Sequence, residues 1–151
     1  MNDASARRFS VRVYYEDTDA GGVVYHGAYF RFAERARTEF LRSLGYDHRT
    51  LSAAHEGMVV VRRCAAEFLA PARLDDLLDL ETELRRLGAA TALFHQTVRR
   101  ARTVLALLET TVVFVDRGGR PRRWPRELRA RLAAEASRAA EAVLERGAAI
   151  D

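Results

Sequence analysis

Apolar and polar residues alternate along several stretches of this chain, and this alternation predicts five strands. Residues 9–15 place Phe9, Val11, Val13 and Tyr15 against polar neighbours, the period-two pattern of a half-buried strand. Four more strands are predicted over residues 58–69, 77–87, 91–99 and 104–115. Residues 112–115 are all apolar, which is typical of a strand inside a sheet rather than at its edge.

Helical spacing replaces alternation in two other stretches. Apolar residues recur at helical intervals over residues 29–44, and Gly45 follows as a C-terminal stop. They cover much of the predicted helix, as expected for a helix surrounded by a sheet: Tyr29, Phe30, Phe32, Ala33, Ala36, Phe40 and Leu41. A short helical turn is expected over residues 51–55.

A terminal helix is predicted over residues 126–146, with Gly147 as its stop. Its apolar stripe is narrow and rich in alanine, so we expect this helix to lie over the outside of the sheet without forming a full core face. The order of elements predicts one α+β domain over residues 1–151, with a core at about 9–125 and a helical arm at about 126–147.

Composition narrows the class of protein. A chain of 151 residues can bury a substantial core, and no apolar run is long enough to span a membrane. No charged-then-apolar leader follows Met1, so a cytoplasmic protein is expected. The single cysteine, Cys64, excludes an internal disulfide framework and is interpreted as a packing residue. The net charge of +4 is carried by arginines interspersed with acids, so no nucleic-acid partner is expected.

The link between the first strand and the first helix gathers the chemically active residues. Residues 14–26 hold three acids, the Gly21–Gly22 pair and His26. Glycine permits backbone angles closed to other residues and lets a ligand approach the main chain. The N-terminus of the following helix presents unpaired N–H groups and a partial positive charge, which can stabilise an oxyanion beside a carboxylate. This layout predicts an acyl-transfer or hydrolysis site.

These same residues carry a family resemblance. The segment VRVYYEDTDAGGVVYHGAYFRFAERARTEFLR, over residues 11–42, resembles the signature of the 4-hydroxybenzoyl-CoA thioesterase family, most closely its Tol–Pal-associated acyl-CoA thioesterase branch. A second match, FLAPARLDD, covers residues 68–76, and the resemblance extends over roughly residues 9–125. It implies a hotdog fold, in which an antiparallel sheet of about five strands wraps a long central helix. It also implies an acyl-CoA thioesterase that needs no cofactor, since coenzyme A is part of the substrate.

The resemblance assigns roles to individual residues. Asp19 matches the family's catalytic aspartate, which acts either as a nucleophile on the thioester carbonyl or as a general base for water. His26 matches a position where the side chain could place water and the backbone N–H could polarise the carbonyl. Tyr15 matches a tyrosine of the closest branch, although a strand residue packing its ring explains it equally well. Asp17 is expected to brace the loop.

Coenzyme A carries phosphates and an apolar arm, so its site requires positive charge at a rim and an apolar tunnel. The substrate-binding candidates are Gly22, Val59, Val60, Val61, Arg62, Arg63 and Arg73. In the family, active sites lie between subunits, so a homodimer or homotetramer is expected. No metal is expected, because His48, His55 and His95 lack ligand spacing.

Two alternatives stay open at this stage. The acyl group could be carried by an acyl carrier protein instead of coenzyme A. The chain could also be a non-catalytic acyl-thioester-binding or scaffold protein of the cell-envelope machinery, although Asp19 and His26 argue against this reading.

Overall fold

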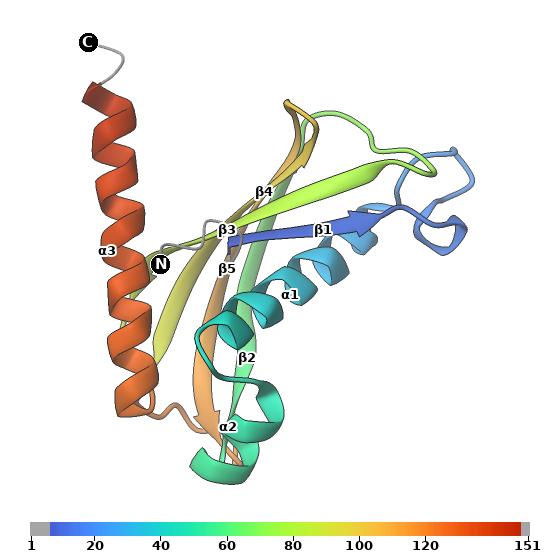
Figure 1. Cartoon of the computed structure of the whole chain (residues 1–151). Helices are drawn as coiled ribbons and strands as arrows, with labels where there is room; N and C mark the ends of the chain where they lie inside the picture. The colour runs from blue at the N-terminus through green and yellow to red at the C-terminus, as the bar shows by residue number, and fades with distance from the viewer. Residues whose placement is uncertain (1–6, 149–151) are drawn as a thin grey trace. The chain divides into compact units, whose positions relative to one another are not determined.

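The computed structural model describes residues 7–148 (Figure 1). Its elements in chain order are β1 (Arg8–Arg12), the 3-10 turn η2 (Tyr15–Asp17), α1 (His26–Ser43), α2 (His48–His55), β2 (Gly57–Phe68), β3 (Leu77–Leu87), β4 (Thr91–Arg100), β5 (Thr103–Asp116) and α3 (Arg126–Ala148). The α+β order predicted from the sequence is confirmed. Short connections between β3, β4 and β5 are those of consecutive hairpins.

The chain divides into two compact units, and each of the four long strands contributes to both. Unit 1 comprises the described residues up to Ser43, with Ala65–Thr82 and Gln96–Glu109. Unit 2 comprises Leu44–Cys64, Glu83–His95 and the described residues from Thr110 onward. The prediction of a single domain over residues 1–151 stays a prediction.

The strands form one sheet in the order β1-β3-β4-β5-β2. β1 and β3 are antiparallel, with Phe9 opposite Leu80 and Val11 opposite Leu78. β5 lies between β4 and β2, and its residues 112–115 are buried, so the prediction of an interior strand is confirmed. β2 lies at an edge of the sheet.

The first strand is shorter than its alternation predicts, ending at Arg12 instead of residue 15. The cause is the turn that follows, in which the buried carboxylate of Asp17 accepts a hydrogen bond from the Tyr14 N–H at 2.9 Å. Val13 remains buried, and its N–H donates to the Asp76 carbonyl at 2.9 Å. Tyr15 consequently leaves the sheet and is 81% exposed.

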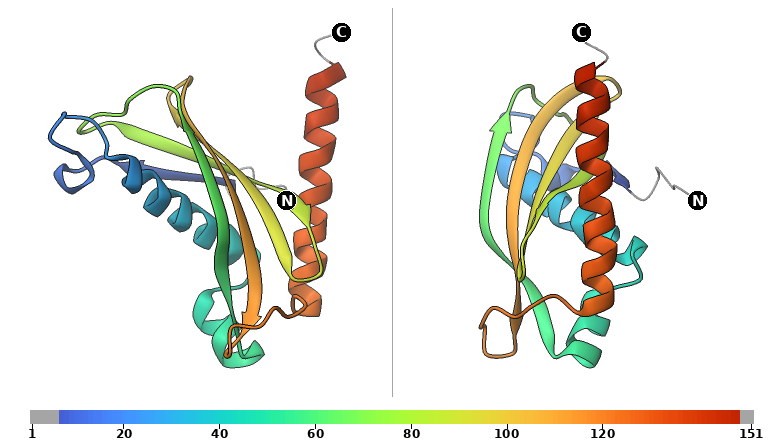
Figure 2. Two further views of the ribbon diagram at one scale, coloured as in Figure 1. Left: turned by 180° about the vertical axis from the view of Figure 1, so that it is seen from behind. Right: turned by 90° about the vertical axis from the view of Figure 1, so that its left-hand side faces the viewer.

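In unit 1, α1 runs alongside β1, as both views in Figure 2 and Figure 1 show. It begins at His26, three residues before the predicted start. Gly45 follows the end of the helix with a φ of +90°, a left-handed backbone conformation that favours glycine. Its buried residues are Ala28, Tyr29, Phe32, Ala33, Ala36, Phe40 and Leu41. Phe30, predicted to be covered, is 36% exposed because it lies outside this face.

Gln96 holds α1 against the sheet within unit 1. Its buried Nε2 donates to the Ala33 carbonyl at 2.9 Å and to Thr82 Oγ1 at 3.1 Å, while its Oε1 accepts from Arg37 at 3.0 Å. A buried amide with partners on both its oxygen and its nitrogen fixes one packing geometry. The position of α1 matters because the helix carries His26 at its first turn.

In unit 2, the apolar stripe of α3 is buried near the start of the helix and exposed near its end. Leu128 and Leu132 are fully buried, whereas Val143 and Leu144 are 49% and 74% exposed, so the helix covers part of the core without forming a full core face, as its thin stripe predicts. The helix continues to Ala148, one residue past the predicted stop at Gly147. None of the described helices is long and apolar enough to cross a membrane.

Trp124 anchors the connection that leads into α3. Its ring stacks on Phe114 with centroids 5.5 Å apart, and its Nε1 donates to the Thr91 carbonyl at 3.2 Å. Phe114 also explains Gly57 at the start of β2, where an added Cβ would lie 2.3 Å from the Phe114 ring. Unit 2 therefore packs around an aromatic pair that leaves no room for a side chain at residue 57.

Candidate active site

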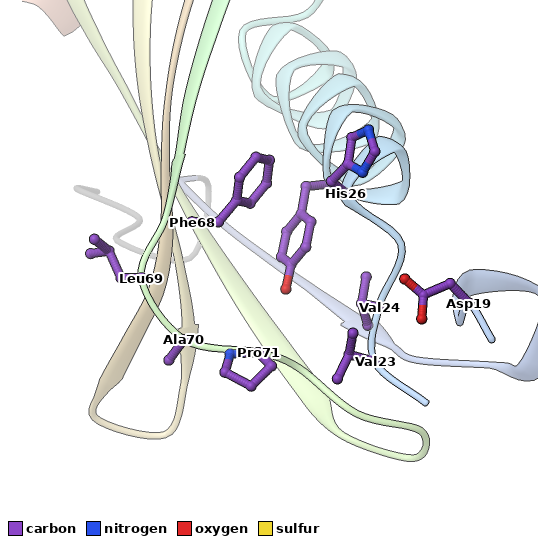
Figure 3. A pocket seen from close by; sticks show the side chains of 9 residues that line it. Asp19, Val23, Val24, His26, Phe68, Leu69, Ala70 and Pro71 are labelled. Atoms are coloured by element: carbon purple, nitrogen blue, oxygen red, sulfur yellow. The ribbon is translucent and has the colours of Figure 1, made fainter. Parts of the chain in front are cut away.

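A cavity of about 380 Å³ lies in unit 1, at the place where the two sequence motifs meet. One side is formed by the loop before α1 and by its first turns, and the other by the segment that leaves β2 (Figure 3). The lining residues are Asp19, Val23, Val24, His26, Tyr29, Phe68, Leu69, Ala70 and Pro71. Most of this lining is apolar, with Asp19 and His26 as its titratable groups apart from the Tyr29 phenol.

Asp19 is held in a tight turn by its own carboxylate and main chain. Its Oδ1 accepts from the Gly21 N–H at 2.8 Å, its N–H donates to the Val23 carbonyl at 2.9 Å, and its carbonyl accepts from Gly22 at 3.0 Å. Gly22 has a φ of +78°, which favours glycine. Figure 3 shows the Asp19 carboxylate on the same side of the cavity as Val24 and His26. One carboxylate oxygen is thus fixed, and the other can face a substrate.

Asp17 has the contacts of a bracing residue, as the sequence predicts. Its side chain is buried, its Oδ1 lies 3.5 Å from the Arg31 guanidinium, and its Oδ2 accepts from the Tyr14 N–H. Its carbonyl accepts from the Tyr25 N–H at 2.8 Å. Asp17 therefore ties both ends of the loop that carries Asp19.

His26 is the first residue of α1 and an exposed part of the cavity wall. Its ring lies 4.4 Å from the Tyr25 ring and 6.4 Å from the Phe68 ring, measured between centroids. The first N–H groups of a helix have no intrahelical acceptor and form its partially positive end. The His26 and Gly27 N–H groups thus belong to a helix end beside the carboxylate of Asp19.

A hydrogen-bonded cluster fixes the opposite wall of the cavity. Arg100 Nη1 donates to Asp76 Oδ2 at 2.8 Å and to the Pro71 carbonyl at 3.2 Å. Asp76 Oδ2 also accepts from the Arg73 N–H at 2.9 Å. Burial acts to raise the pKa of Asp76, but this N–H and the Arg100 guanidinium outweigh it, and the pKa is lowered.

The two walls are joined by main-chain contacts. The Val24 N–H donates to the Ala72 carbonyl at 2.8 Å, and Val23 and Arg73 form an antiparallel bridge. Tyr29 lies at the same end of the cavity, where burial raises the pKa of its hydroxyl and the Ala72 main chain acts to lower it. The cavity therefore has a fixed width at this end.

The lowered pKa of Asp76 predicts a pH dependence of stability. A carboxylate whose pKa is lower in the folded state stabilises the fold above its unfolded pKa of about 4, and this contribution is lost as the pH falls through the folded pKa. We expect Asp76→Asn to lower the urea midpoint at pH 7. Between pH 5 and pH 3, the urea midpoint of the variant should fall less than that of the wild type.

Asp79→Asn serves as a control for this measurement. The Asp79 carboxylate accepts a hydrogen bond from Ser10 on the exposed β1–β3 pair and none from the cavity wall. Parallel acid-side curves for the wild type and Asp76→Asn would show that Asp76 does not contribute in this way.

The structure brings some predicted site residues together and leaves others elsewhere. Asp19 and His26 line the cavity, and Arg73 pairs with the lining residue Val23. Tyr15 and Gly22 belong to the same loop but are not among the lining residues. The remaining substrate-binding candidates, Val59, Val60, Val61, Arg62 and Arg63, belong to unit 2. Their roles, like those of Asp19 and His26, stay predictions.

Several residues of the site are absent from the sequence-based candidates. Tyr29 and Phe68 line the cavity with rings 5.3 Å apart, and both lie within the two matching motifs, which is the signal that could have identified them. Arg100 lies outside both motifs, at the end of a strand, and no local pattern distinguishes it from other surface arginines. Cys64 is half-buried with its Sγ 3.3 Å from Thr110 Oγ1, consistent with a packing residue.

A carboxylate and a helix N-terminus at an apolar cavity are the components of an acyl-transfer or hydrolysis site. Comparison with known families agrees with this class, since the model of the thioesterase-like superfamily matches residues 13–132. The chain belongs to the thioesterase-like superfamily. Its five-stranded sheet, long helix and C-terminal helix are the hotdog fold that the resemblance implied.

Individual relatives are similar over most of their length. The acyl-CoA thioesterase YbgC of Haemophilus influenzae is 46% identical over 123 residues, which cover 81% of this chain and 90% of that protein. The acyl-CoA thioester hydrolase YbgC of Escherichia coli O6:H1 is 48% identical over 110 residues, covering 72% and 81%. A probable thioesterase from Bartonella henselae has a solved structure with a TM-score of 0.76 and 36% identity, covering 78% of this chain and 98% of that one.

Proposed function

We propose that the protein is a cytoplasmic acyl-CoA thioesterase that hydrolyses an acyl-CoA to a free acid and coenzyme A. The observation that carries this proposal is the placement of Asp19 and His26 on one apolar cavity at the N-terminus of α1. The names of the relatives from Haemophilus influenzae and Escherichia coli support the same reaction.

The thioester carbonyl would lie at the N-terminus of α1, with its oxygen accepting from the unpaired N–H groups of the first turn. These donors stabilise the negative charge that develops on the oxygen during attack. A thioester has weak resonance stabilisation, so a polarised carbonyl and a placed carboxylate suffice. No metal or redox cofactor takes part in this mechanism.

Asp19 can supply the attacking group by two routes. As a nucleophile, its free oxygen adds to the carbonyl carbon, the C–S bond breaks, and coenzyme A leaves as a thiolate that takes up a proton. Water then hydrolyses the anhydride and restores the carboxylate. As a general base, Asp19 takes a proton from water as the oxygen of that water adds to the carbonyl, and the proton passes to the departing thiolate. His26 would position the water in either route.

The substrate's two ends have separate requirements. The acyl group fits the apolar lining contributed by Val23, Val24, Phe68 and Leu69. The coenzyme A phosphates would bind arginines, of which Arg73 lies beside the cavity through its bridge with Val23, while Arg62 and Arg63 are exposed on β2.

The direct test is a hydrolysis screen over short, long and aromatic acyl-CoAs, with free coenzyme A detected by its thiol. Turnover of at least one acyl class is expected, and binding without release of thiol would support the non-catalytic alternative. A parallel arm with acyl-loaded acyl carrier protein separates the two acyl donors. Faster release from the carrier protein at equal concentration would reassign the substrate.

A homodimer or homotetramer is expected in solution. β2 is a twelve-residue edge strand with exposed Met58, Val61 and Phe68, and a long edge of this kind offers unpaired main-chain groups to a second strand. The candidates Val59 to Val61 would then serve the site of the neighbouring subunit. Light scattering on the purified protein measures this, and a monomer with full hydrolytic rate would contradict a shared site.

A further inference from the structure

The connection between β5 and α3 presents five arginines within ten residues and no acid among them. They are Arg117, Arg120, Arg122, Arg123 and Arg126, and all are exposed; we call these side chains the arginine surface. Among the described residues, unit 2, which contains it, has fourteen arginines against eight acidic residues, whereas unit 1 has eleven of each. The protein's positive excess is therefore concentrated in the unit that carries this surface.

The main chain beneath the arginine surface is well fixed. Val115 and Pro121 form an antiparallel bridge, and the Arg122 N–H donates to the Phe114 carbonyl at 2.9 Å. The Trp124 N–H donates to the Ala89 carbonyl at 3.1 Å, and the Trp124 side chain is buried. The arginines are thus carried by a main chain that is already ordered, so binding a ligand would not require the connection to become ordered.

Part of the charge of these arginines is used within unit 2. Arg120 and Arg122 lie near the Asp116 carboxylate, whose pKa is lowered by main-chain N–H groups and by these charges. Arg122 also lies over the Phe114 ring. Arg117 and Arg122 each donate to a main-chain carbonyl of α2, at Ser52 and His55, so α2 lies beside the connection at one end of unit 2 (Figures 1 and 2). Within residues 7–148, none of the five forms an ion pair with a carboxylate. The neighbouring Asp116 uses Oδ1 to accept from the Gly118 and Arg120 N–H groups.

The kind of partner follows from what accompanies the arginines. Protein interfaces are anchored by apolar and aromatic side chains, and single-stranded nucleic acids stack on exposed aromatics. Here the aromatic residue of the connection, Trp124, is buried, and the exposed neighbours are Gly118, Gly119 and Pro121. A surface with exposed arginines but no exposed aromatic side chain fits a partner that offers many phosphates at no fixed spacing. An anionic lipid surface is such a partner.

We propose that the arginine surface docks the protein on an anionic phospholipid bilayer. The choice of a bilayer over another polyanion rests on the proposed function, because an acid with an apolar chain partitions into a membrane. Docking would release the free acid at the membrane, into which it partitions. The interaction is peripheral and electrostatic, so it weakens as salt screens the charges.

Vesicle co-sedimentation of the full-length protein tests the proposal without any substrate, so its outcome is independent of thioester hydrolysis. We expect binding to vesicles of phosphatidylcholine with 30% phosphatidylglycerol in low salt, and little binding to phosphatidylcholine alone or in 0.5 M salt. The triple variant Arg120→Gln, Arg123→Gln, Arg126→Gln should lower the partition coefficient by about tenfold or more. These three side chains make no hydrogen bond that the fold needs.

The matched control removes the same charge elsewhere, by Arg35→Gln, Arg86→Gln and Arg102→Gln, which are all exposed. It should change the partition coefficient less than twofold. Equal losses in the two triple variants would overturn the proposal, because net charge alone would then explain binding. Equal or stronger affinity for duplex DNA or an acidic protein in the same buffer, or no vesicle binding by the wild type, would also overturn it.

Discussion

Asp19→Asn is expected to lower kcat for acyl-CoA hydrolysis by about 10²–10⁴-fold, while the protein stays folded. Asparagine retains the side-chain oxygen that accepts from the Gly21 N–H, so the turn should survive. It loses the negative charge that both proposed routes require, since an amide neither attacks a thioester nor takes a proton from water. The measurement is steady-state release of coenzyme A, with a thermal melt to show that the variant is folded.

Glu16→Gln is the matched control, because Glu16 is an exposed acid of the same loop and does not line the cavity. It should keep turnover within about twofold of the wild type. If Asp19→Asn also retained turnover near the wild-type level, Asp19 would be a structural turn residue, and the attacking group would have to be sought elsewhere.

Trp124→Ala is expected to lower the free energy of unfolding by about 3–5 kcal/mol. The side chain is 4% exposed, stacks on Phe114 and donates its indole N–H to the Thr91 carbonyl, so truncation leaves a cavity and removes one hydrogen bond. The Thr91 carbonyl keeps its other bond, from the Gly88 N–H at 2.8 Å, so the lost packing is the main cost. Urea denaturation at pH 7 measures the change. The loss should be among the largest of any single substitution in unit 2.

Leu144→Ala provides the comparison within unit 2, because Leu144 lies on α3 and is 74% exposed. It should change the free energy of unfolding by no more than about 0.5 kcal/mol. A loss below about 1 kcal/mol for Trp124→Ala would mean that the aromatic pair does not anchor the connection to α3.

Strict alternation made the sheet predictable. The strand over residues 77–87 has the predicted bounds, because its alternation matches a burial pattern in which one face is covered. The same reasoning failed at Tyr15, where a turn stabilised by the Asp17 carboxylate overrides the alternation. For α3, helical spacing identified the apolar face but not which part of it is buried, since spacing shows which residues share a face and not how closely a neighbour covers that face.

The candidate site was predictable only in part, for a related reason. Asp19 and His26 are close in sequence, so one motif identifies both, and the structure places both on one cavity. Arg100 acts on Asp76 and Pro71, residues 24 and 29 positions away, and such contacts follow from sheet register, which a single sequence does not reveal.

The main-chain link between the cavity walls, from Val24 to Ala72 and from Val23 to Arg73, limits how this site can diverge. A residue inserted between Asp19 and Val23 would break the turn and shift the bridge, so the length of this loop is closed to variation. Side chains that line the cavity without bonding across it, such as Phe68 and Ala70, are open to change. Selectivity for the acyl group can therefore drift by single substitutions on the β2 side, while the loop with the carboxylate keeps its length.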